Sequence, residues 1–448
     1  MVDWRRSWTA PPPGDGVSRR HAQQFARGFD KYQRRYRKSL ISESTYPDVV
    51  HVLAADELAI GVRKARGLLA RLALPGDALV ALEARLPAGE LRVNERNGLG
   101  RVWPSGDLPV QRVYAIDGDG QLGAAIPLED ATARALALHA ARFAPYPRIA
   151  PRSISFLPIA RGCQASCPFC FSEASASAEQ AGGRLDLELA ARWLAAARRR
   201  GAERAVITGG GEPTLLPRDR LLGLVGTCRE FFAKVVLITN GVRFAGADAG
   251  ERRAWITDLA AAGLGVLAVS RHHWDEAVNA ARMNLETHTE RVLEAARGTS
   301  LRTRLICVLQ RGGVESVADI DAYVQWAAAR GAHEVCFKEL YVSTSRESVY
   351  HSLAANQYSA DHQVPLSRVH EWARTREFAE RERLPWGAPV YAGTIAGSPM
   401  RVAAYTEPSL FWERTHGLAR SWNVMADHTC LVSLEDRASA IGLDEAAA

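Results

Sequence analysis

Three cysteines, Cys163, Cys167 and Cys170, lie within one short, turn-rich segment of this chain. Their spacing is C-x₃-C-x₂-C, with Phe169 directly before the last cysteine. Thiolates are soft ligands that suit iron–sulfur clusters and zinc. A [4Fe–4S] cluster is usually held by four cysteines. A loop of three would therefore leave one iron open to a ligand that is not protein.

A structural zinc site and ordinary buried thiols are the alternative interpretations of this loop. Zinc requires a fourth Cys or His at ligand spacing, commonly a second C-x₂-C or an H-x₃₋₅-H pair. No such residue follows the loop at short range. A second motif farther along the chain also favours the iron–sulfur interpretation.

That second motif is the run Val206–Thr214, which reads VITGGGEPT. A β-branched run that ends in glycines predicts a strand stopping in a tight turn, where the backbone can approach a ligand. Glu212 could accept charge-assisted hydrogen bonds from an amine. The alternative is the first turn of a helix with Glu212 near the positive end of its dipole. That alternative explains the glycines but not their pairing with the cysteine loop.

Together, the cysteine loop and the glycine turn resemble the signature of the radical S-adenosylmethionine (radical SAM) superfamily. The resemblance implies that the open iron binds the amino and carboxylate groups of SAM. It implies that the reduced cluster splits SAM into methionine and a 5′-deoxyadenosyl radical, which abstracts a hydrogen atom from substrate. A flavodoxin or ferredoxin is then the expected low-potential electron donor.

The resemblance also implies a SAM site at the ends of successive strands. Phe169 would pack beside the adenine, and Glu212 would hold the amino end of SAM. The expected contacts to SAM are Phe169, Gly210, Gly211, Glu212, Asn240, Ser270 and Arg271. Asn240 followed by glycine is also ordinary turn chemistry, and Arg271 with the two histidines after it could be a solvated basic cluster. His272 and His273 could instead face the substrate as proton donors.

The sequence around these motifs alternates between short apolar runs and longer helical patterns. The expected strands are Ser153–Leu157, Ala205–Thr208, Val235–Thr239, Gly265–Ser270, Arg304–Leu309 and Glu334–Phe337. The expected helices are Leu187–Arg200, Leu216–Phe232, Glu251–Ala262, Leu285–Arg297 and Val317–Arg330. This alternation predicts right-handed βαβ units and a partial (β/α)₆ barrel over residues 151–345, the fold that the resemblance also implies. Active sites of such barrels lie at the carboxyl ends of the strands, where both motifs fall.

Residues 1–150 are expected to form an α+β domain that could recognise substrate. Residues 19–38 predict an amphipathic helix with a basic face, which could hold nucleic acid or an acidic peptide or could simply be solvated. A β-meander is expected over Leu91–Asn94, Gly100–Trp103, Val110–Ile116 and Leu122–Ile126, followed by a proline-rich linker at 144–151.

Residues 346–448 are expected to close the barrel and line the substrate pocket. Short strands are predicted at Pro399–Tyr405, Phe411–Arg414 and Arg420–Met425. This region contains only Cys430, so auxiliary clusters are not expected unless Cys228, Cys307, Cys336 and Cys430 converge in space. Residues expected to meet substrate directly after the sixth strand are Lys338, Glu339, Tyr341, Ser343 and Ser345.

Cys307 and Cys336 fall on the predicted fifth and sixth strands. A thiol in either position could donate a hydrogen atom to a substrate radical, as in radical SAM peptide epimerases. Packing in the core is the alternative role, because isolated cysteines are usually small buried hydrophobes.

The composition of the 448 residues, 47% hydrophobic and 24% charged, is ordinary for a soluble globular protein. No apolar run approaches the ~18 residues of a membrane span, and the first residues do not form an export signal. Seven cysteines, three of them in one loop, suit a reducing cytoplasm better than a disulfide framework. The net charge of +6 is mildly basic.

The sequence therefore predicts a radical SAM enzyme with one [4Fe–4S] cluster. A ribosomally made peptide is the leading substrate class. Tailoring of an amino acid, sugar or nucleoside is the next, and RNA modification is the third. An iron or redox sensor without enzymatic activity is the alternative outside enzymes, and the glycine turn argues against it because a sensor needs no SAM pocket.

Overall fold

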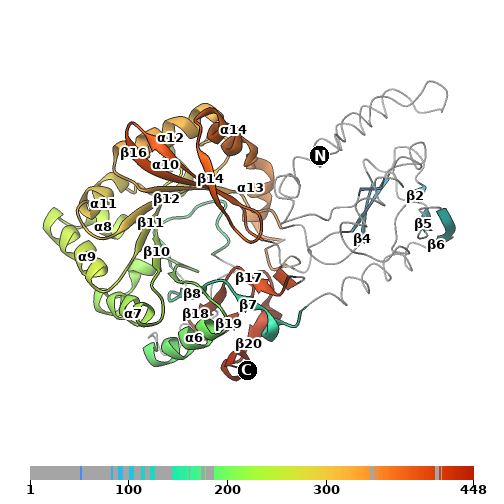
Figure 1. The fold of residues 1–448 in the computed structure, drawn as a ribbon, viewed down its shortest axis with the longest axis horizontal. Coiled ribbons are helices and arrows are strands. Elements are labelled where there is room, and N and C mark those ends of the chain that lie inside the picture. The colour runs from blue at the N-terminus through green and yellow to red at the C-terminus, as the bar shows by residue number, and fades with distance from the viewer. Residues whose placement is uncertain are drawn as a thin grey trace. The chain divides into compact units, whose positions relative to one another are not determined.

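The computed structural model describes residues 144–447, apart from 161, 173–176, 178–185, 344–347, 351, 409–412 and 415, and the backbone of six short strands between 51 and 126. The chain divides into two compact units, residues 1–143 and 144–448 (Figure 1). Each unit is described by itself.

The described strands of the first unit form two separate antiparallel sheets. One sheet contains β1 (His51–Val52), β3 (Gly89–Val93) and β4 (Gly100–Pro104), and the other contains β2 (Leu82–Glu83), β5 (Arg112–Ile116) and β6 (Leu122–Ile126). The predicted strands are present, but the single meander is wrong because β4 and β5 belong to different sheets. The predicted basic helix at 19–38 lies outside the described residues.

A row of six parallel strands forms the centre of the second unit, and the strands follow one another in sequence order. They are β8 (Ile154–Leu157), β9 (Ala205–Ile207), β10 (Val235–Thr239), β11 (Val266–Ser270), β12 (Arg302–Leu309) and β13 (Glu334–Glu339). The predicted order is confirmed, although β13 extends two residues farther than expected and includes Lys338 and Glu339.

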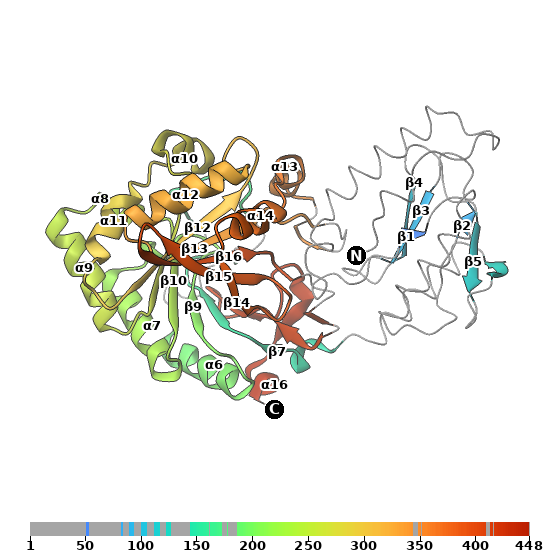
Figure 2. The same ribbon diagram turned by 45° about the horizontal axis from the view of Figure 1, so that its top comes forward.

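Helices cover the outer face of this curved sheet (Figures 1 and 2). They are α6 (Leu187–Arg199), α7 (Arg218–Phe231), α8 (Val242–Gly246), α9 (Ala249–Ala261), α10 (Glu276–Met283), α11 (Thr289–Ala296) and α12 (Val317–Ala329). Side-chain caps fix where several begin: Asp186 accepts from two backbone amides of α6, and Ser316 and Asp319 form a capping box on α12. One or two helices between each pair of consecutive strands make this a partial (β/α)₆ barrel.

The remainder of the chain extends the sheet at both edges. After α13 (Ala354–His362) and α14 (Ser367–Thr375), strands β14 (Ala379–Arg383), β15 (Pro389–Ile395) and β16 (Ser398–Tyr405) join the edge at β13. Strands β18 (Trp422–Met425), β19 (Cys430–Leu431) and β20 (Ala440–Ile441) join the opposite edge at β8. The short strand β17 (Leu418–Ala419) pairs with β7 (Ala150–Pro151), and α16 (Leu443–Ala447) follows β20.

The predicted strands at Pro399–Tyr405 and Arg420–Met425 are confirmed as β16 and β18. The strand predicted at Phe411–Arg414 is wrong where it is described, because Glu413 and Arg414 are helical. Two aromatic residues are followed there by two charged ones, and a pattern of four residues cannot distinguish a strand from a helical turn.

Strand register separates an inner face from a helix-covered face. Ile306 of β12 pairs with Cys336 of β13, and Cys307 pairs with Phe337. The ring of Tyr323 in α12 lies 5.5 Å from that of Phe337, so Cys307 and Phe337 face the helices. The inner face carries an apolar cluster formed by Val206, Val236, Ile238, Val266, Ala268 and Ile306.

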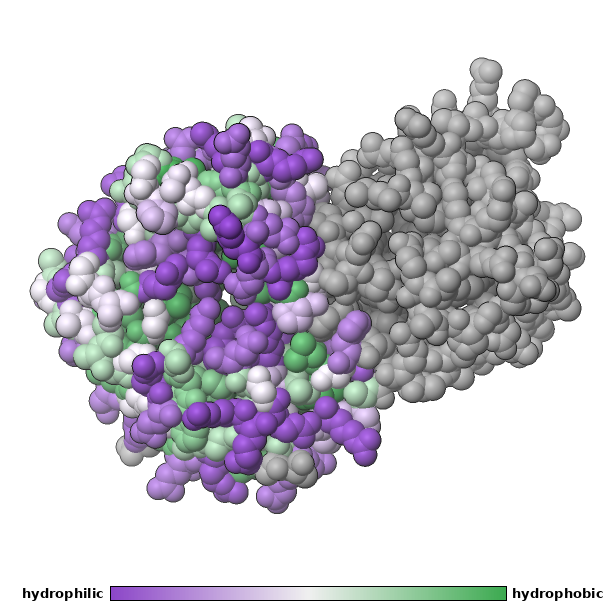
Figure 3. Space-filling view, viewed as in Figure 1, coloured by the Kyte–Doolittle hydropathy of each residue, from purple (hydrophilic) through white to green (hydrophobic). Residues whose placement is uncertain are grey.

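Hydrophilic side chains cover much of the visible face of residues 144–447, interspersed with smaller hydrophobic areas (Figure 3). Among the described residues, the large hydrophobic residue exposed to solvent is Leu215, with 37% of its surface accessible. None of the helices described is long and apolar enough to cross a membrane.

Candidate functional site

The cysteine loop follows β8. Gly162, directly before Cys163, fixes this loop to the turn after β9. Gly162 has φ of 115°, which a residue with a side chain rarely adopts. Its carbonyl accepts a hydrogen bond of 2.9 Å from the backbone amide of Glu212. A Cβ atom on Gly211 would lie 2.2 Å from that same carbonyl oxygen. The two motifs are therefore in direct contact, and Gly211 is required for them to approach so closely.

The middle of the loop is held by the segment that follows α10. The Ser166 amide donates to the Met283 carbonyl at 3.0 Å, and Asn284 Nδ2 donates to Ser166 Oγ at 2.8 Å. Asn284 itself has φ of 50°, in the left-handed region that asparagine tolerates better than most residues. These contacts fix the backbone between the first two cysteines.

Glu212 is buried between the segments that follow β9 and β10, and its carboxylate accepts hydrogen bonds from both. Its Oε1 accepts from the Thr214 amide, from Thr214 Oγ1 at 2.7 Å and from Thr239 Oγ1 at 2.6 Å. Its Oε2 accepts from the Asn240 amide at 2.8 Å. A carboxylate can accept about four hydrogen bonds, two at each oxygen. From the described residues, Oε2 accepts one, that of the Asn240 amide. Oε2 is thus the atom that could still accept from a ligand amine.

Asn240, at the end of β10, reaches the first cysteine. Its Nδ2 lies 3.6 Å from Cys163 Sγ and 3.1 Å from Gln164 Oε1. Its Oδ1 accepts from the Val242 amide at 3.0 Å, which fixes the orientation of the side-chain amide. Asn240 is therefore placed at the cysteine loop, and in this structure its amide group contacts protein.

The three thiols lie close enough to influence one another electrostatically. Burial, assisted by the charges of Cys170 and Cys163, raises the pKa of Cys167 to about 12. Partial burial of its thiol also raises the pKa of Cys163, although the residue as a whole is exposed. Since thiolates are the metal-binding form, binding of iron here would release protons.

The donor set fits a [4Fe–4S] cluster with one open iron. Among the described residues, no three His, Cys, Asp or Glu side chains are arranged to hold a single metal ion. The cysteines of a cluster bind separate irons and need not converge on one point. Cys163 and Cys170 are exposed, so incoming iron can reach them.

Phe169, within the cysteine loop, packs against His272, which follows β11. Their rings are 5.0 Å apart in an edge-to-face arrangement. His272 Nδ1 accepts from the Val308 amide at 3.0 Å, so its remaining proton lies on Nε2. Burial lowers the pKa of His272 to about 3. His272 is therefore a neutral hydrogen-bond donor and not a charged acid at neutral pH.

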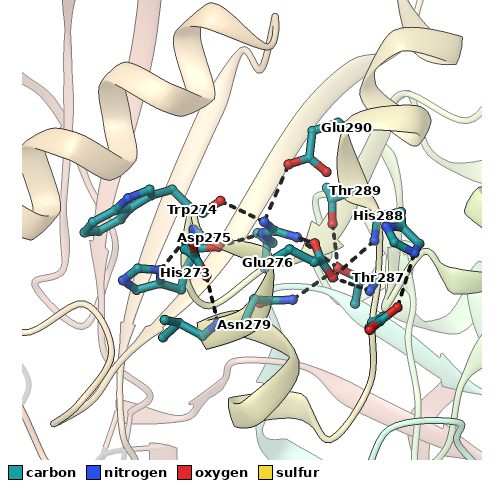
Figure 4. A network of polar contacts seen from close by, with 12 residues as sticks. His273, Trp274, Asp275, Glu276, Asn279, Thr287, His288, Thr289 and Glu290 are labelled. Atoms are coloured by element: carbon teal, nitrogen blue, oxygen red, sulfur yellow. Dashed lines mark hydrogen bonds and ion pairs between the residues drawn. The ribbon is translucent and has the colours of Figure 1, made fainter.

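Arg271 holds together the loop after β11. Figure 4 labels residues of this loop and of the network around it, from His273 to Glu290. The Nε atom of Arg271 donates to the His273 carbonyl at 2.6 Å, and one terminal nitrogen contacts Glu276 and Thr287. The other terminal nitrogen donates to the Trp274 carbonyl at 2.8 Å and lies 3.5 Å from Glu290.

A guanidinium has five N–H donors, and this fully buried side chain makes four hydrogen bonds and one ion-pair contact, with Glu290. The expectation that Arg271 contacts SAM is not supported by this geometry. Sequence inspection could not reveal this network, because the carboxylates come from α10 and α11. Ser270, directly before Arg271, is paired with Ile306 and shares the inner face of the barrel.

The two candidate hydrogen donors face opposite sides of the sheet. Cys307 is completely buried on the helix side, and its thiol donates to the His272 carbonyl at 3.6 Å. The expectation that Cys307 donates hydrogen to substrate is therefore not supported. Cys336 lies on the inner face with Ile306 and Lys338.

Charged residues surround the carboxyl end of β13. Glu407 Oε1 accepts from Lys338 Nζ at 2.8 Å and from Arg420 at 2.7 Å. Burial alone would lower the pKa of Lys338, but Glu407 raises it above its usual value. Glu435 accepts from Tyr341 and, at 3.3 Å, from Ser343. Ser345 lies outside the described residues.

Sequence reasoning did not identify Thr214, Thr239 and Gln164 as parts of the site. Thr239 ends β10 directly before Asn240, and this position at the end of a strand could have identified it as part of the site. The contact of Gln164 with Asn240 could be found only from the folded chain, because the two residues lie 76 positions apart. Thr214 bonds to Glu212 only two positions away, within the glycine-turn motif.

Residues 157–306 match the family model of the radical SAM superfamily. No curated protein matches the sequence. Similar solved structures include SuiB from Streptococcus suis bound to S-adenosylmethionine, with 16% identity, 68% of this chain and 64% of that chain covered and a TM-score of 0.41.

The complex of SuiB with its precursor peptide SuiA has 15% identity, covers 69% of this chain and 64% of that one, and has a TM-score of 0.42. Coproporphyrinogen III oxidase (HemN) from Escherichia coli has 15% identity, covers 59% and 65%, and has a TM-score of 0.37. The matches span less than two thirds of the length of these structures, and no residue role is inferred from them.

Proposed function

We propose that this chain, which belongs to the radical SAM superfamily, reductively cleaves SAM at a single [4Fe–4S] cluster held by Cys163, Cys167 and Cys170. When bound, the cluster and SAM supply a 5′-deoxyadenosyl radical that abstracts hydrogen from substrate. The observation that carries this proposal is the contact between the cysteine loop and the glycine turn, through Gly162 and Gly211.

The residues of the chain position and enclose these groups. The backbone of Gly210 and Gly211 and the Oε2 atom of Glu212 would hold the amino end of SAM. Phe169 would pack beside the adenine, and Ser270 faces the same interior from β11. The electron would come from a low-potential flavodoxin or ferredoxin.

The test is anaerobic reconstitution followed by reduction with dithionite in the presence of SAM. We expect about four irons and four sulfides per chain and release of 5′-deoxyadenosine. Replacing all three loop cysteines with alanine should abolish both. Cys336→Ala is the matched control and should keep the cluster and SAM cleavage. Unchanged iron content in the triple variant would refute the assignment.

We further propose a ribosomally made peptide as the substrate. Support comes from the separate unit of residues 1–143 and from the basic segment 19–38, which could hold an acidic leader peptide. Amino acid, sugar or nucleoside tailoring is the alternative, and RNA modification is the third candidate. Residues 346–448, with Glu407 and Arg420, would line the substrate pocket.

Charge reversal separates these substrate classes. Changing Arg34, Arg35, Arg37 and Lys38 together to Glu should raise the KM for a leader-bearing peptide, with a steep dependence on salt. Cleavage of SAM without substrate should not change. An equal KM for the variant and the wild type at low salt would remove this segment from substrate recognition.

Cys336 is proposed as a hydrogen-atom donor to the substrate radical, because it faces the barrel interior. Cys336→Ala should then stop formation of product while 5′-deoxyadenosine is still released. Normal product from Cys336→Ala would assign this thiol to packing.

A further inference from the structure

The amino-terminal end of the barrel, opposite the cysteine loop, carries a cluster of basic side chains. We call it the basal cluster, and it consists of Arg152, Arg204, Lys234, Arg302, Arg304 and Arg401, with the carboxylates Glu203, Glu334 and Glu382. Six cations thus meet three carboxylates, and the proposed reaction at the other end of the strands does not use any of them.

Strand register places much of this cluster on the inner face. Arg304 pairs with Glu334, and Glu334 pairs with Arg401 on β16. Arg204 and Lys234 directly precede β9 and β10, each two residues before the inner-facing Val206 and Val236. The apolar inner cluster that contains these valines lies one layer farther along the strands, which separates the basal cluster from the cysteine loop.

The carboxylates are distributed unequally among the cations. Glu334 accepts from both Arg302 and Arg304, with Oε2 2.7 Å from Arg304 Nε. Glu382 accepts from Arg401 at 2.8 Å. The side chains of Arg204 and Lys234 form no hydrogen bond or ion pair with any described residue. Burial and the neighbouring arginines lower the pKa of Arg204, which is half-buried, and of Lys234, although Lys234 is exposed at the surface of this cluster.

Arg152 provides an independent observation. It is 7% exposed, and its Nε and one terminal nitrogen have no hydrogen-bond partner. Its nearest carboxylate oxygens, on Glu203 and Glu382, lie at 3.4 and 3.8 Å. Buried guanidinium donors are normally satisfied, and the charge of Arg152 is one of those that act on Arg204.

We propose that the amino-terminal end of the barrel binds a dianionic oxyanion, of the phosphate or sulfate type, between Arg152, Arg204 and Lys234. Arginine presents a planar fork of donors that matches such oxygens, and lysine adds a point charge. A singly charged carboxylate would leave the excess of positive charge only partly compensated. The site is separate from the SAM site, so this proposal does not depend on the proposed function.

The test measures thermal unfolding and calorimetric binding of inorganic phosphate to the full chain, with sodium chloride holding ionic strength constant. Wild type should show saturable stabilisation by phosphate and much less by acetate. Arg204→Gln should raise the half-saturating phosphate concentration at least tenfold. Arg368→Gln is the matched control, because it removes one exposed arginine on α14 whose ion-pair partner, Glu371, is not part of this cluster.

The melting temperature in chloride alone distinguishes loss of phosphate binding from a failure of the variant to fold. In chloride alone, Arg204→Gln and Lys234→Gln should melt at the same temperature as wild type or higher, because each removes repulsion between like charges. Lower melting temperatures with an unchanged response to phosphate would overturn the proposal and make these cations structural. A wild-type response to phosphate no greater than that to chloride would also overturn it.

Discussion

Gly211 is the residue at which the two sequence motifs meet. Its missing side chain lets the glycine turn lie against the Gly162 carbonyl, where a Cβ would come within 2.2 Å. We expect Gly211→Ala to displace the cysteine loop and to reduce iron loading severely, because a backbone carbonyl cannot rotate away as a side chain can.

Gly226→Ala is the control for that prediction. Gly226 lies within α7 with nothing within 4 Å of a built Cβ. Alanine there should load iron normally and stabilise the fold by about 0.5–1 kcal/mol. Iron and sulfide analysis after reconstitution checks both variants, and full loading of Gly211→Ala would contradict the geometry.

His272 should make folding stability depend on pH. Its pKa is about 3 in the folded chain and roughly 6.5 when unfolded. The unfolded state therefore binds an additional proton as pH falls below about 6.5, and stability is lost between that pH and about 3. At pH 5 the loss should be about 2 kcal/mol.

Urea unfolding at pH 7 and pH 5 measures this effect. His272→Asn keeps an acceptor near Nδ1 and removes the titrating group, so its stability should fall less than that of wild type between the two pH values. Equal losses for the two proteins would show that His272 titrates normally.

At the scale of elements, the loop from Arg271 to Glu290 depends on one guanidinium. Arg271→Gln should destabilise the protein by about 3 kcal/mol, because the fully buried guanidinium loses its ion pair with the partly exposed Glu276 and the His273 and Trp274 carbonyls lose their donor. Hydrogen exchange should increase over residues 271–290. Arg271→Lys keeps the charge but not the five donors, and should recover part of the loss.

This prediction also separates a structural role from a role in SAM binding. If Arg271 contacts SAM, Arg271→Gln should bind SAM weakly and unfold like wild type. Equilibrium dialysis with SAM and guanidinium denaturation, made on the same reconstituted sample, distinguish these outcomes.

For the whole second unit, Glu407 connects the two edges of the sheet. It lies after β16, and it contacts Lys338 on β13 and Arg420 just before β18. Glu407→Gln should cost about 2 kcal/mol, because two partly buried cations lose their shared partner and these side chains are still in part exposed to solvent.

Amide hydrogen exchange in β18 should also become faster in Glu407→Gln, because the contact between Glu407 and Arg420 lies just before this strand. Glu371→Gln, on the exposed face of α14, is a control that breaks a surface pair with Arg368 and should cost little. A Glu407→Gln variant as stable as wild type would show that pairing of β18 with β8 is sufficient to hold that edge.

The sequence by itself determined the order of strands and helices in the barrel and the two motifs at its carboxyl end. These features depend on local information: hydrophobic periodicity, glycine turns and cysteine spacing. It also singled out Glu212, in the glycine turn after β9, and Asn240, directly after β10, and their contact with SAM stays a prediction.

Only the tertiary structure decided what these side chains contact. Cys307 and Cys336 look alike in sequence, but strand register places one against α12 and the other toward the interior. Arg271 looks like a ligand-binding residue, but carboxylates from α10 and α11 use its donors. The basal cluster joins residues more than two hundred positions apart, because parallel strands bring their starting points to the same end of the barrel.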